Sequence, residues 1–374
     1  MRGQTVIAGI GHTSYGKHEG RSTVSLNIEA CRKAISDAGV APGEVDALFV
    51  KVPTSKVEMM YGQKLAEAMR LEPRVGGVWD QGGASNISMI SLAAMAIEAS
   101  QCEIALVTLA DNPRTGTRQA YEKAWGDDAV FGWFSVVASY AMIARRHSHD
   151  HGTTEDQLAA IAIAARAHGA TNPDAQLKVP LTRDAYFNSP WIVEPLRRAD
   201  CCLISDGAAA VVVMSAKRAH QRRVEMPVPI LGFGQGNTSS DVALRNDMTA
   251  SKADVAAATA YAMAGLGPKD IDVAQIYDCF TITALMTLEA YGLAPRGNSD
   301  HLYEPGGFGV DGPLPLNTSG GLLAETGMPG MQLVLEGVRQ MRGTSSNQVK
   351  RAKTCIVSNQ GGIMHTHSTL ILGQ

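Results

Sequence analysis

Short aliphatic runs alternate along the chain with longer Ala-rich segments of amphipathic period, the pattern of an α/β protein. Residues 104–110 and 208–214 are almost wholly aliphatic, as in strands that helices cover on both faces. The opening stretch "MRGQTVIAGIGHTSYG" predicts a strand, and its apolar run is too short for a signal peptide. No apolar stretch reaches the roughly 18 residues of a membrane span, so we expect a soluble, cytoplasmic protein.

Two segments of the chain share one template. "AGVAPGEVDALFV" at residues 38–50 and "AGLGPKDIDVAQI" at residues 264–276 each place Ala-Gly, Pro, Asp and an apolar run at the same spacing. In both, Gly39 or Gly265 ends an Ala-rich helix, and the Pro-containing segment turns into a buried strand.

A second echo follows at a similar offset. A double glycine at Gly82 and another at Gly320 each precede an apolar-rich helix and then an aliphatic strand. Two chance-related α/β units would explain this, but duplication explains the order better. We expect an N-terminal half over residues 1–225, interrupted by an insertion at about residues 112–200, and a C-terminal half over residues 226–374. Strand–helix–strand alternation in each half predicts mainly parallel strands with right-handed crossovers.

The insertion is polar and partly helical. Thr154 to Gln157 forms a capping-box signature before the Ala-rich stretch "QLAAIAIAARAH". His147, His149 and His151 alternate in "RRHSHDH", and on a helix end they would not share one face. We therefore expect solvated polar surface there and no metal site.

Composition excludes some functions. The formal net charge is −3, whereas a nucleic-acid-binding protein needs a basic face. The six cysteines contain no C-x-x-C pair, and Cys201 and Cys202 are adjacent, which fits neither a zinc site nor a disulfide framework.

The double glycines offer candidate anion sites. Gly82-Gly83 and Gly320-Gly321 each place backbone amides at the start of a predicted helix, as suits an oxyanion. The turn after the second pair holds no acid, base or nucleophile; its residues are Thr326, Gly327, Met328 and Pro329.

Four ordered motifs, "ADCCLISDGAAAVVVMS", "YDCFTI", "NTSGGLLA" and "SNQGGIMHTHSTLIL", resemble the thiolase superfamily. The best match is its branch of sterol-carrier-protein-X thiolases and lipid-transfer-protein-like acyl-CoA aldolases. The resemblance covers essentially the whole chain. It implies an α/β, thiolase-like fold of two similar mixed-sheet halves in five layers, α-β-α-β-α, with an inserted loop domain, and a homodimer.

The thiolase catalytic side chains are replaced in this sequence. By the resemblance, the nucleophilic cysteine falls on Gly83, with Ser85 and Ser88 nearby as caps or, less simply, as nucleophiles. The second cysteine falls around Asn359 and the histidine on Met328. The Asn-Glu-Ala-Phe motif becomes Tyr277-Asp278-Cys279-Phe280.

The remaining chemistry rests on few groups. Tyr277 can donate a hydrogen bond to an enolate or act as a general acid or base, or simply pack at a strand end. Asp278 is a catalytic candidate or a structural carboxylate. His365 and His367 face the same side in an extended strand, so either can serve as proton acceptor or orient the substrate, with His367 preferred. Cys279 and Cys355 fit buried core positions, as does Met328, which can alternatively line an acyl pocket.

Retro-aldol cleavage of a β-hydroxyacyl-CoA suits such a site, because it needs a base and an oxyanion hole but no acyl-enzyme. Aldolases of the matching branch use tyrosines, of which one matches Tyr277 and the other falls on Gly327. A thiolase-type acyltransferase with a displaced nucleophile, Cys279 being the nearest, and a non-catalytic acyl-CoA-binding subunit are the alternatives. The resemblance implies a coenzyme A thioester as substrate with no other cofactor, and a small OB-fold, zinc-ribbon partner subunit. Neither nucleic acid nor a membrane is expected as a partner.

Overall fold

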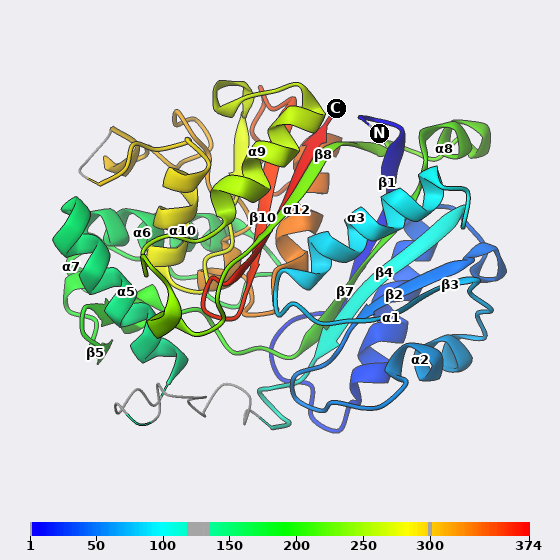
Figure 1. The fold of residues 1–374 in the computed structure, drawn as a ribbon, viewed down its shortest axis with the longest axis horizontal. Coiled ribbons are helices and arrows are strands. Elements are labelled where there is room, and N and C mark those ends of the chain that lie inside the picture. The colour runs from blue at the N-terminus through cyan, green and yellow to red at the C-terminus, as the bar shows by residue number, and fades with distance from the viewer. Residues whose placement is uncertain (1, 118–129, 131–134, 298–300) are drawn as a thin grey trace.

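A nine-stranded mixed sheet runs through the part of the chain that the computed structural model describes, residues 2–117, 130, 135–297 and 301–374 (Figure 1). The strand order is β3-β2-β4-β7-β1-β8-β11-β10-β9. Only two residue pairs, Val6↔Pro229 and Ile7↔Val228, join the first five strands to the last four. The strands are β1 Thr5–His12, β2 Ala47–Lys51, β3 Val75–Trp79, β4 Ile104–Asp111, β7 Gly207–Ser215, β8 Val228–Asn237, β9 Val273–Gln275, β10 Thr354–Gly361 and β11 Thr366–Gly373.

The expectation of mainly parallel strands is wrong. Strand β2 pairs in parallel with β3 and β4, and β9 pairs in parallel with β10. The five other pairings, β1–β7, β1–β8, β4–β7, β8–β11 and β10–β11, are antiparallel. Strands β10 and β11 are joined by a tight hairpin, which can connect only antiparallel neighbours, whereas a parallel pair needs a longer crossover.

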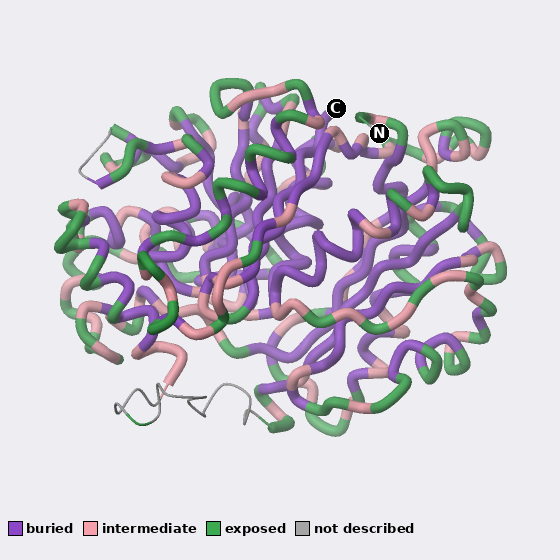
Figure 2. Tube along the Cα trace, in the orientation of Figure 1, coloured by how far each residue is buried: buried purple, intermediate pink, exposed green. Residues whose placement is uncertain are grey.

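The helices form three layers with the sheet halves between them. Alternation along β2 sends Leu48 toward α1 and α2, and Phe49 toward α3 and α12. Along β10, Val357 faces α3 and α12, whereas Ile356 faces α9 and α10. Figure 2 shows this central layer as almost wholly buried. The five-layer prediction is confirmed. The helices are α1 Thr23–Asp37, α2 Tyr61–Met69, α3 Ser85–Glu98, α8 Ala216–Arg222, α9 Ala253–Ala264, α10 Thr281–Ala290, α11 Gly321–Ala324 and α12 Met331–Arg342.

The first internal repeat is present in the structure. Gly39 and Gly265 have φ of +63° and +62° at the ends of α1 and α9, a conformation that glycine adopts without strain. A 3₁₀ turn follows each, η1 (Pro42–Glu44) and η5 (Pro268–Asp270), and leads into β2 or β9.

The second repeat differs from the expectation. Gly320-Gly321 opens only the four-residue helix α11, and the amphipathic helix α12 begins later, at Met331 after Gly330. Pro329 explains the interruption, since it has no N–H to donate and disfavours helical geometry in the residue before it.

The insertion is mainly helical where it is described. Thr154 and Gln157 form the predicted capping box at the start of α6. His147 is buried and its Nε2 lies 2.9 Å from Glu289 Oε2, so the expectation of solvated surface is wrong for this histidine. Residues 118–129 and 131–134 lie outside the described part. The elements are α5 Val136–His151, α6 Glu155–Thr171, α7 Arg183–Phe187, β5 Trp191–Val193, β6 Leu196–Arg197 and η3 Arg198–Asp200.

The described residues contain neither a membrane-spanning helix nor a cluster of metal-ligating side chains. No helix there has the length and apolarity needed to cross a bilayer. No group of three or more His, Cys, Asp or Glu side chains is arranged to hold a metal ion.

Candidate active site

Four connecting segments meet at one end of the central layer. They are residues 81–84 before α3, residues 277–280 after β9, the turn 326–330 before α12, and the β10–β11 hairpin. Close backbone approaches define the meeting point. A β-carbon on Gly82 would lie 2.9 Å from Gly361 Cα, and one on Gly330 would lie 2.6 Å from Asn359 Nδ2.

Tyr277 lies against Gly83, where the resemblance places the thiolase cysteine. A β-carbon added to Gly83 would stand 2.6 Å from both the Tyr277 hydroxyl and its Cε2, and 2.5 Å from the Gln360 carbonyl oxygen. The ring is buried, and the Tyr277 backbone N–H donates to Ser358 Oγ at 3.0 Å. The phenol therefore fills the room that a side chain at position 83 would need.

Two buried amides hold these segments together. Asn86 Nδ2 donates to the carbonyls of Gly83 (3.0 Å) and Pro329 and to Asn359 Oδ1 (3.2 Å). Asn359 Nδ2 donates to the Gly330 carbonyl at 3.1 Å. Asn359, at the predicted second-cysteine position, thus joins β10 to the turn and to α3, and Asn86 was not singled out from the sequence.

The serines at the start of α3 hold the loop in place. Ser85 Oγ accepts from the Gln81 N–H at 2.8 Å and donates to the Gly82 carbonyl at 2.7 Å. Ser88 Oγ donates to Gln81 Oε1 at 2.6 Å. The Gly82 N–H donates to Asp80 Oδ1 at 3.1 Å. These hydrogen bonds fix the conformation of the loop before α3. The remaining electrostatic feature at this position is the positive end of the α3 dipole.

The site at the second double glycine is already occupied by the carboxyl group of Asp278. The N–H groups of Leu322 and Leu323 donate to the Asp278 carboxylate at 2.7 and 3.5 Å, and a β-carbon on Gly321 would lie 2.2 Å from Asp278 Oδ2. Burial raises the pKa of this carboxyl to about 7, against the opposing effect of the Leu322 hydrogen bond. The N–H groups that follow Gly320-Gly321 are therefore taken up by Asp278 and do not face a thioester oxygen in this structure, contrary to the expectation. Asp278 makes the contacts of a structural carboxylate.

The turn before α12 has no room for a second tyrosine. A β-carbon on Gly327 would lie 1.7 Å from the Leu203 carbonyl oxygen. Met328 is buried in the apolar cluster that also contains Tyr277, which favours its interpretation as core filler.

His367 faces away from α3. Ser368 Oγ donates to the Ala84 carbonyl at 2.8 Å, so strand alternation directs the neighbouring His367 to the opposite face of the sheet. His365 precedes β11 and lies in the hairpin, where a β-carbon on Gly362 would stand 1.8 Å from its ring, so the two histidines do not share one face as expected. His367 is fully buried, and neither ring nitrogen has a hydrogen-bond partner among the described residues. Burial, with help from Arg245 and His365, lowers the pKa of His367 to about 3; burial also lowers the pKa of His365.

Cys279 lies beside two residues that the sequence did not single out. Gln360 Nε2 donates to Cys279 Sγ at 3.0 Å and to the Tyr140 hydroxyl at 2.9 Å. Burial raises the pKa of the Cys279 thiol to about 12, so it is protonated at neutral pH. Cys355 is buried in the central cluster, as its strand context indicates. Tyr140 belongs to α5 and carries no local motif, whereas Gln360 adjoins the quoted Gly-Gly.

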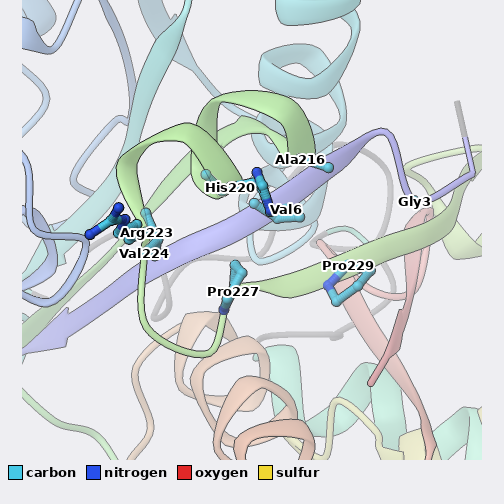
Figure 3. A pocket seen from close by; sticks show the side chains of 9 residues that line it. Gly3, Val6, Ala216, His220, Arg223, Val224, Pro227 and Pro229 are labelled. Carbon is cyan, nitrogen blue, oxygen red and sulfur yellow. The ribbon is translucent and has the colours of Figure 1, made fainter.

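A surface pocket of about 500 Å³ lies between α8 and strands β1 and β8 (Figure 3). His220 and Arg223 come from its α8 side, and Pro227 and Pro229 from the segment entering β8. No candidate catalytic residue lines this pocket, so it is separate from the site around Tyr277.

Comparisons with known proteins give consistent matches. A family model described as thiolase C-terminal domain-like matches residues 234–374. The chain is 35% identical to a steroid side-chain-cleaving aldolase of Thermomonospora curvata over 100% of this chain and 98% of that protein. It is 34% identical to a 17-hydroxy-3-oxo-4-pregnene-20-carboxyl-CoA lyase of Mycobacterium tuberculosis over 100% of both. A solved structure described as an Ltp2–ChsH2(DUF35) aldolase is similar with a TM-score of 0.90 and 34% identity, covering 100% of this chain and 98% of that one.

Proposed function

We propose that this protein is an acyl-CoA lyase that cleaves a β-hydroxyacyl-CoA by a retro-aldol reaction, on the premise that the chain belongs to the thiolase superfamily, in its branch of lipid-transfer-protein-like aldolases. The observation that carries the proposal is the Tyr277 phenol, which takes the room of a side chain at position 83. The reactive group beside the start of α3 is then the Tyr277 hydroxyl, a general acid or base, in place of a cysteine thiol.

The reaction balances without a covalent intermediate. A base removes the proton of the β-hydroxyl, the Cα–Cβ bond breaks, and its electron pair moves into the thioester as an enolate. A ketone or aldehyde leaves, and the enolate takes a proton at Cα. Tyr277 is suited to donate a hydrogen bond to the thioester oxygen as charge develops, or to supply the proton at Cα. The positive end of the α3 dipole lies beside Gly83 and favours the same charge.

Thiolase-type acyl transfer has less support. A cysteine at position 83 would clash with Tyr277 and Gln360, and Met328 stands where the thiolase histidine is expected. The nearest alternative thiol, Cys279, is held by Gln360 and is protonated because burial raises its pKa. Attack by a thiolate is correspondingly disfavoured.

A small partner subunit is part of the proposal. The related solved structure is described as a complex with a DUF35 subunit, which supports an OB-fold, zinc-ribbon partner that helps to bind acyl-CoA. We extend the proposal to a homodimer. Strand β3 lies at the edge of the sheet, and Val78 on it and Val57 and Met59 before α2 are exposed.

A cleavage assay tests the proposed function. Purified protein, alone and with a co-purified DUF35-type partner, is given a tertiary β-hydroxyacyl-CoA, and separately a β-ketoacyl-CoA with free CoA. Release of a ketone and a shorter acyl-CoA without free CoA supports the lyase. CoA-dependent thiolysis supports the acyltransferase instead. Absence of turnover in both, with acyl-CoA still bound, leaves only a binding subunit.

A further inference from the structure

The Gln360 side chain bonds three residues near Tyr277. It is buried, and its Nε2 donates both to Tyr140 Oη and to Cys279 Sγ. Its Oε1 accepts from the Met364 N–H at 2.9 Å. A primary amide has two N–H donors, and both have acceptors here. Such a satisfied buried amide has one favourable orientation, which fixes its partners relative to one another.

Those partners come from three separate segments. Cys279 follows Tyr277 by two residues, Tyr140 lies on α5 of the insertion, and Met364 lies in the hairpin between β10 and β11. Tyr140 also donates to the Gly362 carbonyl at 2.9 Å, which closes the group of contacts.

The Gln360 backbone completes the arrangement from the other side. Its carbonyl oxygen stands 2.5 Å from where a β-carbon on Gly83 would be, and the Tyr277 hydroxyl stands 2.6 Å from the same point. One residue thus supports the loop that carries Tyr277 and also forms a wall beside the phenol.

We propose that Gln360 is a positioning residue for Tyr277, acting through Cys279 and the hairpin and not by touching the substrate. The proposal rests on the proposed function, because it assigns Tyr277 its reactive role. It also gives the insertion a part in the site: the Tyr140 contact makes α5 a support for the orientation of the phenol. Misplacement of a reactive group by about 1 Å can cost about 100-fold in rate, so a small rotation of this loop would matter.

A double-mutant cycle in kcat separates positioning from general support. The variants are Gln360→Leu, Tyr277→Phe and the pair, assayed with a tertiary β-hydroxyacyl-CoA. We expect Gln360→Leu to lower kcat about 10- to 100-fold with KM nearly unchanged when Tyr277 is present. In the Tyr277→Phe background the same change should cost less than about 3-fold. Equal losses in both backgrounds would overturn the proposal.

Gln157→Leu is the matched control. Gln157 is another buried glutamine of the insertion, and its Nε2 donates to the Gly297 carbonyl of the C-terminal half at 2.8 Å. This variant loses a buried amide of the same kind. Its kcat should nevertheless stay within about 2-fold of the wild-type value, a difference no larger than the usual error with which mutational free energies add.

If the wild-type protein cleaves no substrate, the proposed function is wrong. Hydrogen exchange at the Tyr277 amide then still tests whether Gln360 holds the loop. The Tyr277 N–H donates to Ser358 Oγ and should exchange faster in Gln360→Leu but not in Gln157→Leu. Unchanged exchange at Tyr277 in Gln360→Leu would show that Gln360 does not hold this loop.

Discussion

The hydroxyl of Tyr277 occupies the space that a side chain on Gly83 would need: a β-carbon on Gly83 would stand 2.6 Å from the phenol oxygen, whereas a β-carbon essentially never comes within 3.0 Å of a non-neighbouring atom. A cysteine at position 83 and a tyrosine at position 277 in this orientation therefore exclude each other. The absence of a cysteine at position 83 and the presence of a phenol at position 277 are therefore structurally linked.

Removing the Tyr277 hydroxyl should abolish most of the activity. Tyr277→Phe keeps the ring in the central apolar cluster, so we expect the fold to persist while kcat falls by about 10²- to 10⁴-fold, the usual contribution of a positioned acid or base. Steady-state kinetics measure the loss. Tyr261→Phe is the control, because it removes another buried phenol whose hydroxyl donates to the Tyr291 carbonyl at 3.2 Å. Wild-type turnover by Tyr277→Phe would refute the role of the phenol.

Adding one carbon at position 83 should disturb both the fold and the reaction. In Gly83→Ala the new methyl meets Tyr277 and the Gln360 carbonyl, and such overpacking costs about 1–3 kcal/mol of unfolding free energy. We also expect kcat to fall at least about 10-fold, because the phenol must move. Gly43→Ala is the control, since a β-carbon there meets nothing within 4 Å. If Gly83→Ala and Gly43→Ala have the same free energy of unfolding and the same kcat, Gly83 does not lie this close to Tyr277.

Asp278 should make stability fall as the pH rises. Its pKa is raised in the folded state to about 7, from an unfolded value of 3.8, so the unfolded chain gains by ionising first. The contribution of Asp278 to the free energy of unfolding is complete below pH 3.8 and is lost progressively as the pH rises through 7. Between pH 5 and 7.5 this loss is on the order of 3 kcal/mol. Asp278→Asn should lack that slope in urea denaturation followed across this range. Parallel wild-type and variant profiles would contradict the assignment.

His367 should act in the opposite direction. Its pKa is lowered to about 3 from 6.5, so its contribution is present above pH 6.5 and is lost as the pH falls toward 3. Between pH 6.5 and 4.5 the loss is on the order of 3 kcal/mol. In His367→Phe the acid-side loss should be smaller by about this amount, while the other buried histidines, such as His365, still contribute theirs. An acid limb unchanged by the substitution would show that His367 is not held neutral.

Much of the architecture was readable from the sequence. The repeated Ala-Gly…Pro…Asp segments did mark matching helix ends and strands, because a left-handed glycine, a proline turn and an apolar run act locally. The direction of each strand in the sheet could not be predicted from local sequence. Whether β7 returns antiparallel beside β4 depends on where the chain re-enters the sheet after the insertion, which no nearby residue records.

The site was readable to a lesser extent. Tyr277 and Gly83 could be named from their motifs, but their mutual exclusion depends on an approach between residues far apart in the sequence. The glycine cradle was recognisable, yet only the tertiary structure shows that Asp278 fills it. Tyr140 escaped notice because a single tyrosine on α5 has no local signature, and its importance comes from Gln360 on a distant strand.

The shared central layer also has a consequence for synthesis. Helix α3 and the inner faces of β2 and β4 are covered by α12, β10 and β11, which are translated more than two hundred residues later. A ribosome adding about 5–20 residues per second leaves that face without its cover for ten seconds or more. The nascent N-terminal half therefore presents a broad apolar surface during elongation, and holding chaperones should engage it before the C-terminal half emerges.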